Sequence, residues 1–429
     1  MKTTFKNWSE SVVCHPAERL YPSSEEEISK IIINAKARNQ KIRVVGSGHS
    51  FTPLVETDSI LISLDRLKGL ISADKTKLEA EVFAGTKLRD LGPLLHQKGM
   101  AVENMGDIDK QSVAGAFSTS THGTGINFGI LSTQVLAITL INGEGEIIRL
   151  EKEMHGDEFK AAQVSLGMLG IITRMKLRLL PSYKLNYVAK KSTFDEALAN
   201  IEKYNAENRN FEFFWFPHTE SCQVKFANTT DKKISNETFH KWNGLVMENY
   251  ALKVVSEISR VFSAPKSMAK LSAAGLSGSD YTNWSYKVFT TDRLVKFQEM
   301  EFNIPREFFK AALREMKEMI EAKQIKVHFI IECRFVKQDD ILISPAYGRE
   351  SAYIAVHMYK GMEYKMYFDE AQKIFMKYGG RPHWGKMHFC TKEYLQNQYP
   401  KWNVFSEIRK KYDSQNMFLN EYLEKLFKE

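Results

Sequence analysis

The sequence predicts a mixed α+β fold, and three patterns indicate it. Ser24 and Glu27 form a capping-box signature, and isoleucines recur behind them at the three- and four-residue spacing of an amphipathic helix. Residues 41–45 form a short apolar run and residues 78–83 alternate, as strands do. Helical and strand patterns then follow one another without an internal repeat. With 429 residues, of which 43% are hydrophobic, the chain can form two or three domains with buried cores.

The remaining elements follow from the same periodicities in chain order. Pro181 is the expected boundary between two domains, and residues 220–300 carry the weakest patterns. Within that stretch, the Ser/Gly/Ala-rich patch 263–279 is compatible with a linker, a lid or an ordinary helix. The predicted helices are 24–39, 87–98 (closed by Gly99), 194–207, 304–322 and 364–378, and the predicted strands are 41–45, 60–64, 78–83, two strands around the turn 142–145, 171–180, 211–216, 326–336 and 353–359.

Composition argues against several classes of protein. No apolar run reaches the roughly 18 residues of a membrane-spanning helix, and residues 1–10 are too polar for a secretory signal. The four cysteines are scattered without the CxxC spacing of a zinc ribbon, so we expect a reducing, cytoplasmic location. The net charge of +8 is spread over the chain, and no nucleic-acid-binding motif accompanies it. We therefore expect no nucleic-acid partner and a ligand that is a small molecule.

Two glycine-rich loops are the first candidates for a binding site. Gly46 and Gly48 follow a strand, but Phe51 stands where a Rossmann fingerprint has its third glycine, so a plain tight turn explains this loop equally well. The second loop, residues 112–125, offers small residues and hydroxyl groups whose backbone N–H groups can approach a diphosphate, although a Ser/Thr-rich hairpin loop has the same composition. Two such loops together suit an extended dinucleotide better than a single phosphate.

His49 is the reactive residue of the first loop. Between Gly48 and Ser50 it can cap a turn, bind a metal or act as a nucleophile. Metal binding is disfavoured because no HxH, HxxxH or HExxH spacing lies nearby. An imidazole can also bond covalently to the 8-methyl group of a flavin.

Two later strands place polar side chains on one face. In the strand predicted up to residue 336, period-two geometry puts His328, Glu332 and Arg334 opposite a wholly apolar face. In the next strand, His357 also lies on the more polar face. A solvated face or a structural ion pair gives the same pattern. If both polar faces point into one cavity, a carboxylate, a guanidinium and an imidazole converge there and can hold a polyhydroxylated ligand.

Eight segments resemble one superfamily of flavoproteins, the vanillyl-alcohol-oxidase superfamily with its PCMH-type FAD-binding domain. Within it, the chain is most similar to the sugar-1,4-lactone oxidases (L-gulonolactone and D-arabinono-1,4-lactone oxidases), with the alditol oxidases as near relatives. The segments keep the order of that family, and the C-terminal His-Trp-Gly-Lys makes the set specific. They are residues 45–50, 112–115, 121–125, 169–173, 332–335, 344–349, 381–386 and 416–420.

The resemblance implies a fold in which both chain ends build the FAD domain. Residues 1–180 and 376–429 form this two-part domain, and residues 181–375 form a substrate domain whose antiparallel sheet is covered by helices. In covalent members of the family the histidine of the Gly-His-Ser loop bears the flavin, so we expect FAD bonded to His49. The cofactor-binding residues that the resemblance implies are Val45, Gly46, Ser47, Gly48, His49, Ser50, Ser112, Gly115, Ser118, Thr121, His122, Gly123, Thr124, Gly170, Ile172, His383 and Lys386.

The expected reaction is the oxidation of a CH–OH group, with hydride transfer to flavin N5. His357 is the expected base, because a neutral imidazole is available near pH 7. Glu332 and Arg334 are expected to hold neighbouring hydroxyl groups, and Lys386 to stabilise the anionic reduced flavin. No metal is expected.

The predicted function is therefore an FAD-dependent oxidoreductase acting on a sugar-1,4-lactone of the D-arabinono-, L-gulono- or L-galactono type, with O2 as acceptor. Three alternatives stay open at this point: an alditol oxidase for xylitol- or sorbitol-type substrates, a lactone dehydrogenase that uses another acceptor, and a flavin-binding protein without turnover.

Overall fold

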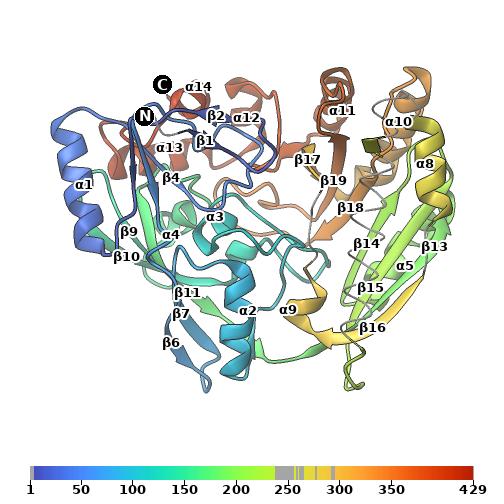
Figure 1. The fold of residues 1–429 in the computed structure, drawn as a ribbon, viewed down its shortest axis with the longest axis horizontal. Coiled ribbons are helices and arrows are strands. Elements are labelled where there is room, and N and C mark those ends of the chain that lie inside the picture. Colours follow the sequence, from blue (N-terminus) through green and yellow to red (C-terminus); the bar gives the residue numbers. More distant parts are fainter. Residues whose placement is uncertain are drawn as a thin grey trace.

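The structure is a computed structural model that describes residues 4–236, 256–257, 259, 265–275, 278–290 and 295–428. Two small sheets lie on one side of the molecule and a large sheet lies on the other (Figure 1). The small sheets are a parallel one of order β3 (Glu18–Leu20), β5 (Ile60–Ser63), β4 (Ile42–Val45) and an antiparallel one of order β10 (Ile147–Glu151), β9 (Val135–Ile141), β11 (Ile171–Arg178), β7 (Glu79–Phe83), β6 (Leu70–Asp74).

The large sheet is antiparallel and has eight strands. Short pairs β1 (Phe5–Lys6) with β2 (Val13–Cys14), and β8 (Met100–Ala101) with β12 (Leu180–Pro181), complete the strands described. The strand order of the eight-stranded sheet is β16 (Ser279–Trp284), β13 (Lys184–Thr193), β15 (Ser221–Thr229), β14 (Asn210–Trp215), β18 (Ile331–Val336), β19 (Ser351–Tyr359), β17 (Phe297–Pro305), β20 (Arg381–Pro382).

Helices cover the outer faces of these sheets (Figure 1). The described α-helices are α1 (Glu25–Ala37), α2 (Leu88–Gln97), α3 (Val113–Ser118), α4 (Gly156–Gln163), α5 (Phe194–Glu207), α8 (Pro265–Ala274), α9 (Ser285–Val288), α10 (Phe309–Ala322), α11 (Lys365–Lys377), α12 (Lys392–Gln398), α13 (Trp402–Tyr412) and α14 (Glu421–Phe427), with 3-10 turns at Leu131–Gln134 and Arg306–Phe308. The predicted α+β class, with a helix-covered antiparallel sheet, is confirmed.

The register of the large sheet separates an apolar face from a polar face. Phe213, Cys333, Ile354 and Phe302 are cross-strand neighbours on β14, β18, β19 and β17, and all four are buried. Because successive side chains alternate between faces, their neighbours in sequence form the opposite row. That opposite row is Lys225, Glu212, Arg334, Tyr353 and Asn303, one residue on each of five adjacent strands.

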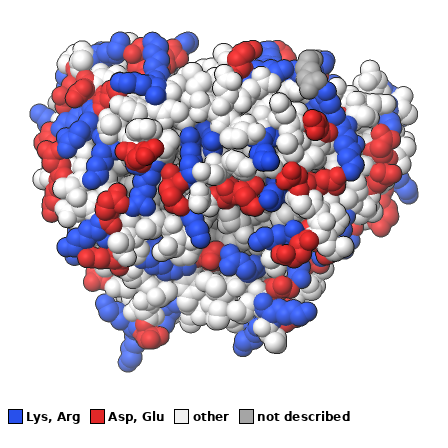
Figure 2. Space-filling view, turned by 180° about the vertical axis from the view of Figure 1, so that it is seen from behind, with Lys and Arg blue, Asp and Glu red and all other residues white. Residues whose placement is uncertain are grey.

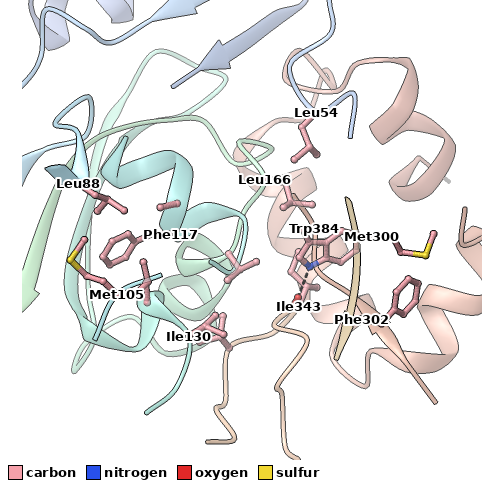
Figure 3. Packing of buried hydrophobic residues seen from close by; sticks show 14 of the residues in the cluster. Leu54, Leu88, Met105, Phe117, Ile130, Leu166, Met300, Phe302, Ile343 and Trp384 are labelled. Carbon is pink, nitrogen blue, oxygen red and sulfur yellow. Dashed lines mark hydrogen bonds between the residues drawn. The ribbon is translucent and has the colours of Figure 1, made fainter. Parts of the chain in front are cut away.

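The apolar core is continuous across the two sides of the molecule. Figure 3 shows Leu88 and Phe117 from one side and Phe302 from the other, with Trp384 between them. The Trp384 ring is fully buried, and its Nε1–H donates to the Ile343 carbonyl at 2.7 Å. Satisfying the indole N–H in this way lets the ring lie in the core without an unpaired polar atom.

Helix starts follow the capping chemistry of the sequence, with one shift. Ser24 Oγ accepts the N–H of Glu27, but the Glu27 carboxylate accepts from the N–H of Ser23 and not of Ser24. A complete capping box instead begins α5, where Thr193 and Glu196 bond reciprocally.

Three predictions differ from the structure, and the patch 263–279, which was left open among a linker, a lid and an ordinary helix, contains a helix. The predicted helix 304–322 begins only at Phe309, because residues 297–305 form strand β17. The predicted strand 326–336 is a strand only from Ile331, and His328 bonds to Ser256 instead of joining the polar face. The loop 112–125 contains the helix α3, and within the patch 263–279 residues 265–274 form α8, while residues 263–264 and 276–277 lie outside the described residues.

Two further observations concern membrane-spanning helices and the charge of the surface. In the part of the chain that the structure describes, no helix is both long and apolar enough to span a bilayer. On the face shown in Figure 2, basic and acidic side chains are interleaved, and they form no continuous basic band there. That face therefore lacks the charge distribution typical of a nucleic-acid groove.

Candidate active site

A cleft, which encloses about 950 Å³ when the solvent space at its open mouth is included, lies between the parallel sheet and the five-stranded sheet. One wall is the loop after β4, and the other is formed by α3 and by the segment that leads into β11. Its lining includes these predicted cofactor residues: Val45, Gly46, Ser47, Gly48, His49, Ser50, Ser112, Gly115, Ser118, Gly170 and Ile172.

Glycine is required where the walls of this cleft meet. A Cβ on Gly46 would lie 2.2 Å from Ser112 Oγ, so the two loops can approach only without a side chain there. Gly48 has φ +66°, and Gly170 has φ +141° with a Cβ position 2.3 Å from the Ile141 carbonyl oxygen. Bare backbone along an elongated cleft fits an extended dinucleotide such as FAD, whose diphosphate needs close approach of backbone N–H groups.

His49 lines the cleft and lies beside an N-terminal hairpin formed by β1 and β2. The Trp8 ring stacks on the His49 ring with centroids 5.6 Å apart and an interplanar angle of 23°. Burial, with help from Lys386, lowers the pKa of His49 to about 4. The imidazole is therefore neutral at pH 7 and retains the lone pair that a nucleophile needs. Trp8 was not among the residues predicted from the sequence.

The hairpin also reaches the large sheet. The backbone N–H of Trp8 donates to the Gly48 carbonyl at 2.7 Å, and Asn7 Nδ2 donates to the Ser50 carbonyl at 2.9 Å. Glu10 then pairs with Lys296 at 2.6 Å and with Lys360, beside the ends of β17 and β19. The hairpin thus connects the loop 45–50 to the large sheet, which bears the polar face.

Arg334 lies at the centre of that polar face, among three carboxylates. Its Nε donates to Glu212 Oε2 at 2.8 Å, and its Nη2 contacts Glu332 Oε1 and lies 3.4 Å from Asp107 Oδ1. Among the described residues, Nη1 has no partner, so it can donate to a ligand. Burial, with Asp107 and Glu212 nearby, raises the pKa of Glu332 to about 7 although Arg334 opposes this rise. Glu332 therefore titrates near neutral pH.

His357 is engaged through both ring nitrogens. Nδ1 bonds to the Ile330 carbonyl at 3.0 Å, which makes Nδ1 the protonated nitrogen, and Nε2 lies 3.5 Å from Glu299 Oε1. Burial alone would lower the pKa of His357, but the Glu299 carboxylate raises it above its usual value. Near pH 7 the free protein therefore holds more imidazolium than an isolated histidine, which differs from the neutral base expected from the sequence.

Lys386 is half-buried and pairs with the other oxygen of Glu299. Burial alone would lower the pKa of Lys386, but Glu299 and Glu301 raise it, so the ammonium stays charged. Glu299 and Glu301 are two of the functional candidates that the sequence prediction missed. Their alternation in the segment 297–305 was a readable signal, because it puts two carboxylates on one face of a strand.

His122 and His383 surround Glu301 in a buried cluster. His122 Nε2 lies 3.1 Å from Glu301 Oε1, and the ligand atoms of the three residues lie within 4.8 Å of one another, a spacing that a metal ion could use. However, Gly385 N–H donates to His383 Nδ1 at 3.0 Å, so the proton of this ring is on Nε2. His122 Nδ1 donates to the Gly123 carbonyl at 2.8 Å, and its Nε2 faces the Glu301 carboxylate. The proton on Nε2 of His383 disfavours a metal ion shared by all three residues.

The predicted residues thus fall into three groups. Those of the loop 45–50, of α3 and of residues 170–172 line the cleft. Glu332, Arg334 and His357 share the polar face of the large sheet, and Lys386 joins them through Glu299. Among the others, His122 and His383 form the cluster with Glu301, Thr121 accepts from Gln111, and Gly123 and Thr124 line a separate cavity beside Arg334.

A glycine-lined dinucleotide cleft beside a buried acid–guanidinium–imidazole face defines a class, the FAD-binding oxidoreductases with a PCMH-type fold. Residues 16–151 match the family model of an FAD-binding domain. A solved structure of cholesterol oxidase from B. sterolicum aligns with a TM-score of 0.82 over 100% of this chain and 97% of that chain. At 16% identity, this likeness concerns the fold alone.

The chain belongs to the D-arabinono-1,4-lactone oxidase family, whose model matches residues 175–426. L-gulono-1,4-lactone dehydrogenase of Mycobacterium tuberculosis (strain ATCC 25618 / H37Rv) is 36% identical over 426 residues, which cover 98% of both chains. L-gulonolactone oxidase of Mus musculus is 34% identical over 438 residues, covering 99% of this chain and 98% of the relative. The predicted family, fold class and FAD cofactor are confirmed, and the covalent bond to His49 stays a prediction.

Proposed function

We propose that the protein oxidises a CH–OH group of a sugar-1,4-lactone with FAD as its cofactor. The observation that supports this most is the polar face itself, where Glu332, Arg334 and His357 lie on adjacent strands and Lys386 is tied to them by Glu299. Relatives that match nearly the whole chain act on lactones as dehydrogenase and as oxidase. The acceptor that we propose is O2.

Each group has a distinct task in this proposal. Bound FAD, held by the loop 45–50 and by α3, supplies the hydride acceptor. Arg334 donates from Nη1 to a substrate oxygen, and Glu332 binds a neighbouring hydroxyl group. Lys386 keeps a positive charge at the site, where it stabilises the negative charge that the reaction places on the cofactor.

The proton of the reacting hydroxyl group goes to His357 in this proposal. Its Nε2 is the unprotonated nitrogen of the neutral ring, and Glu299 stabilises the imidazolium that results. Glu332 is the competing base because its pKa of about 7 leaves it partly ionised. The variants His357→Gln and Glu332→Gln separate the two, since only loss of the true base removes the acid limb of the pH profile of flavin reduction.

The division of the chain stays part of the proposal: residues 1–180 and 376–429 for the FAD domain, residues 181–375 for the substrate domain. Contacts between distant segments support it, since Lys41 donates to the Asn416 carbonyl at 2.6 Å and Arg43 donates to the Phe418 carbonyl. We also propose a cytoplasmic location, because all four cysteines are free thiols.

The test is anaerobic bleaching of the visible flavin band by lactones and alditols in parallel. Bleaching by a lactone supports the proposal, preference for xylitol or sorbitol would favour an alditol oxidase, and no bleaching by either would indicate a flavin-binding protein without turnover. Peroxide formed on readmission of air distinguishes an oxidase from a dehydrogenase. For the bond to His49, all flavin should leave the His49→Ala variant after acid precipitation but remain with the wild-type pellet.

A further inference from the structure

A second cavity adjoins the candidate active site at Arg334. It encloses about 460 Å³ when the solvent space at its open mouth is included, and its floor is formed by β13, β15, β14 and β18. Lys225, Glu212 and Arg334 are consecutive cross-strand neighbours, and Glu332 lies two residues from Arg334 on the same face. The cavity is therefore a lateral continuation of the polar face, on the side away from β19 and β17.

The cavity has a polar side and an apolar side. Lys225 Nζ is fixed between the Phe214 ring, at 3.4 Å, and Glu212 Oε1, at 3.5 Å. Asp107 enters from the opposite side and contacts Arg334. Tyr187, Ala227, Val288 and Phe289 supply the apolar part of the lining. This combination suits a hydroxylated carbon chain, whose O–H groups bond to charged side chains while its C–H groups contact aromatic and apolar walls.

The charges of the cavity favour a neutral ligand. Arg334 and Lys225 contribute two positive charges, which are matched by the carboxylates of Glu212 and Asp107. An anionic ligand, such as a sugar phosphate, would add a charge that no unmatched cation in this group offsets. A polyhydroxylated chain without charge can instead exchange hydrogen bonds with all four groups.

We propose that this cavity is a second substrate subsite, which binds the exocyclic hydroxylated chain of the lactone and selects its length through Lys225 and Glu212. The inference rests on the proposed function and extends it to the substrate class. The reacting carbon then lies over β18, β19 and β17, and the chain extends past Arg334 toward β14 and β15.

The experiment compares L-gulono-1,4-lactone, which has a two-carbon chain on its ring, with D-arabinono-1,4-lactone, which has a single CH2OH group there. Lys225→Met removes the ammonium group at similar length, and Ala227→Leu narrows the cavity without touching Arg334. Each variant should lower kcat/KM for the gulono-lactone about tenfold, because Lys225→Met loses one charge-assisted hydrogen bond and Ala227→Leu introduces a clash of similar cost. For the arabinono-lactone, kcat/KM should change less than about twofold. Glu220→Gln, in an exposed ion pair with Lys317 outside the cavity, is the matched control.

Two outcomes would overturn the subsite: equal losses for both lactones, or no loss for either. Calorimetric affinities of the FAD-loaded protein for both lactones are measured beside turnover, so that this failure is distinguishable from failure of the proposed function. If wild type binds lactones without reducing its flavin, the proposed reaction fails and the ratio of affinities decides the subsite. If wild type binds neither lactone, both proposals fail.

Discussion

Replacing Glu332 by Gln should make the protein more stable at alkaline pH while it lowers activity. Burial and the neighbouring carboxylates raise the pKa of Glu332 from 4.5 to about 7. The native state thus holds this proton longer than the unfolded state, and stability falls as pH rises through the interval from 4.5 to 7 and stays reduced above it. The cost of the ionised carboxylate is roughly 1 kcal/mol at about pH 5.5 and roughly 3 kcal/mol above pH 7.

Glutamine carries no charge, so Glu332→Gln removes this cost. Urea unfolding of the FAD-loaded protein is measured at about pH 5.5 and about pH 8.5. The free energy of unfolding of Glu332→Gln should exceed that of wild type at both pH values, and the excess should be roughly 2 kcal/mol larger at the alkaline pH. The exposed Glu318→Gln serves as a control and should show no such difference. If Glu332→Gln is less stable than wild type at alkaline pH, or if its effect is the same at both pH values, the argument that Glu332 is held against its charge is refuted.

Three further outcomes follow from the site. Trp8→Ala should lower the fraction of flavin that stays on the protein in a denaturing gel, because the stacked ring no longer orients His49, and Trp8→Phe should retain most of it; equal fractions in both would contradict this role. Gly46→Ala should weaken FAD binding at least about tenfold in a fluorescence titration, because the added Cβ would lie 2.2 Å from Ser112 Oγ, and adding Ser112→Ala should recover part of the loss. Lys386→Met should slow flavin reduction about a hundredfold in stopped-flow measurements, since one half-buried positive charge is lost, and an unchanged rate would exclude that role.

Local sequence patterns predicted an element correctly where its hydrophobic periodicity and its capping residues indicate the same ends. The helix 194–207 matches α5 at both ends because Thr193 and Glu196 form a complete capping box. The start of α10 was misplaced because Pro305 suits the first turn of a helix, yet here it ends the strand β17, and the helix begins at Phe309. Glu299 lies in the stretch 220–300, where the sequence patterns were weakest, and it was missed for that reason.

The candidate site was predictable only where its residues occur in motifs. Glu332, Arg334 and the loop around His49 are short sequence signatures, so they were found. Glu212 was not, because its partner Arg334 lies 122 residues away and a single glutamate in an aromatic strand resembles a solvent-facing residue. Such a contact depends on the pairing of β14 with β18, which no local pattern specifies.

The N-terminal hairpin also constrains the order in which the protein is completed during biosynthesis. Glu10 meets its partners Lys296 and Lys360 only after nearly the whole polypeptide has left the ribosome. The ion pairs that join the hairpin to the large sheet therefore form late, when most of the chain has been synthesised. For recombinant work, we expect a fusion at the carboxyl end to leave the N-terminal hairpin undisturbed, whereas an extension at the amino end is attached only a few residues from this hairpin.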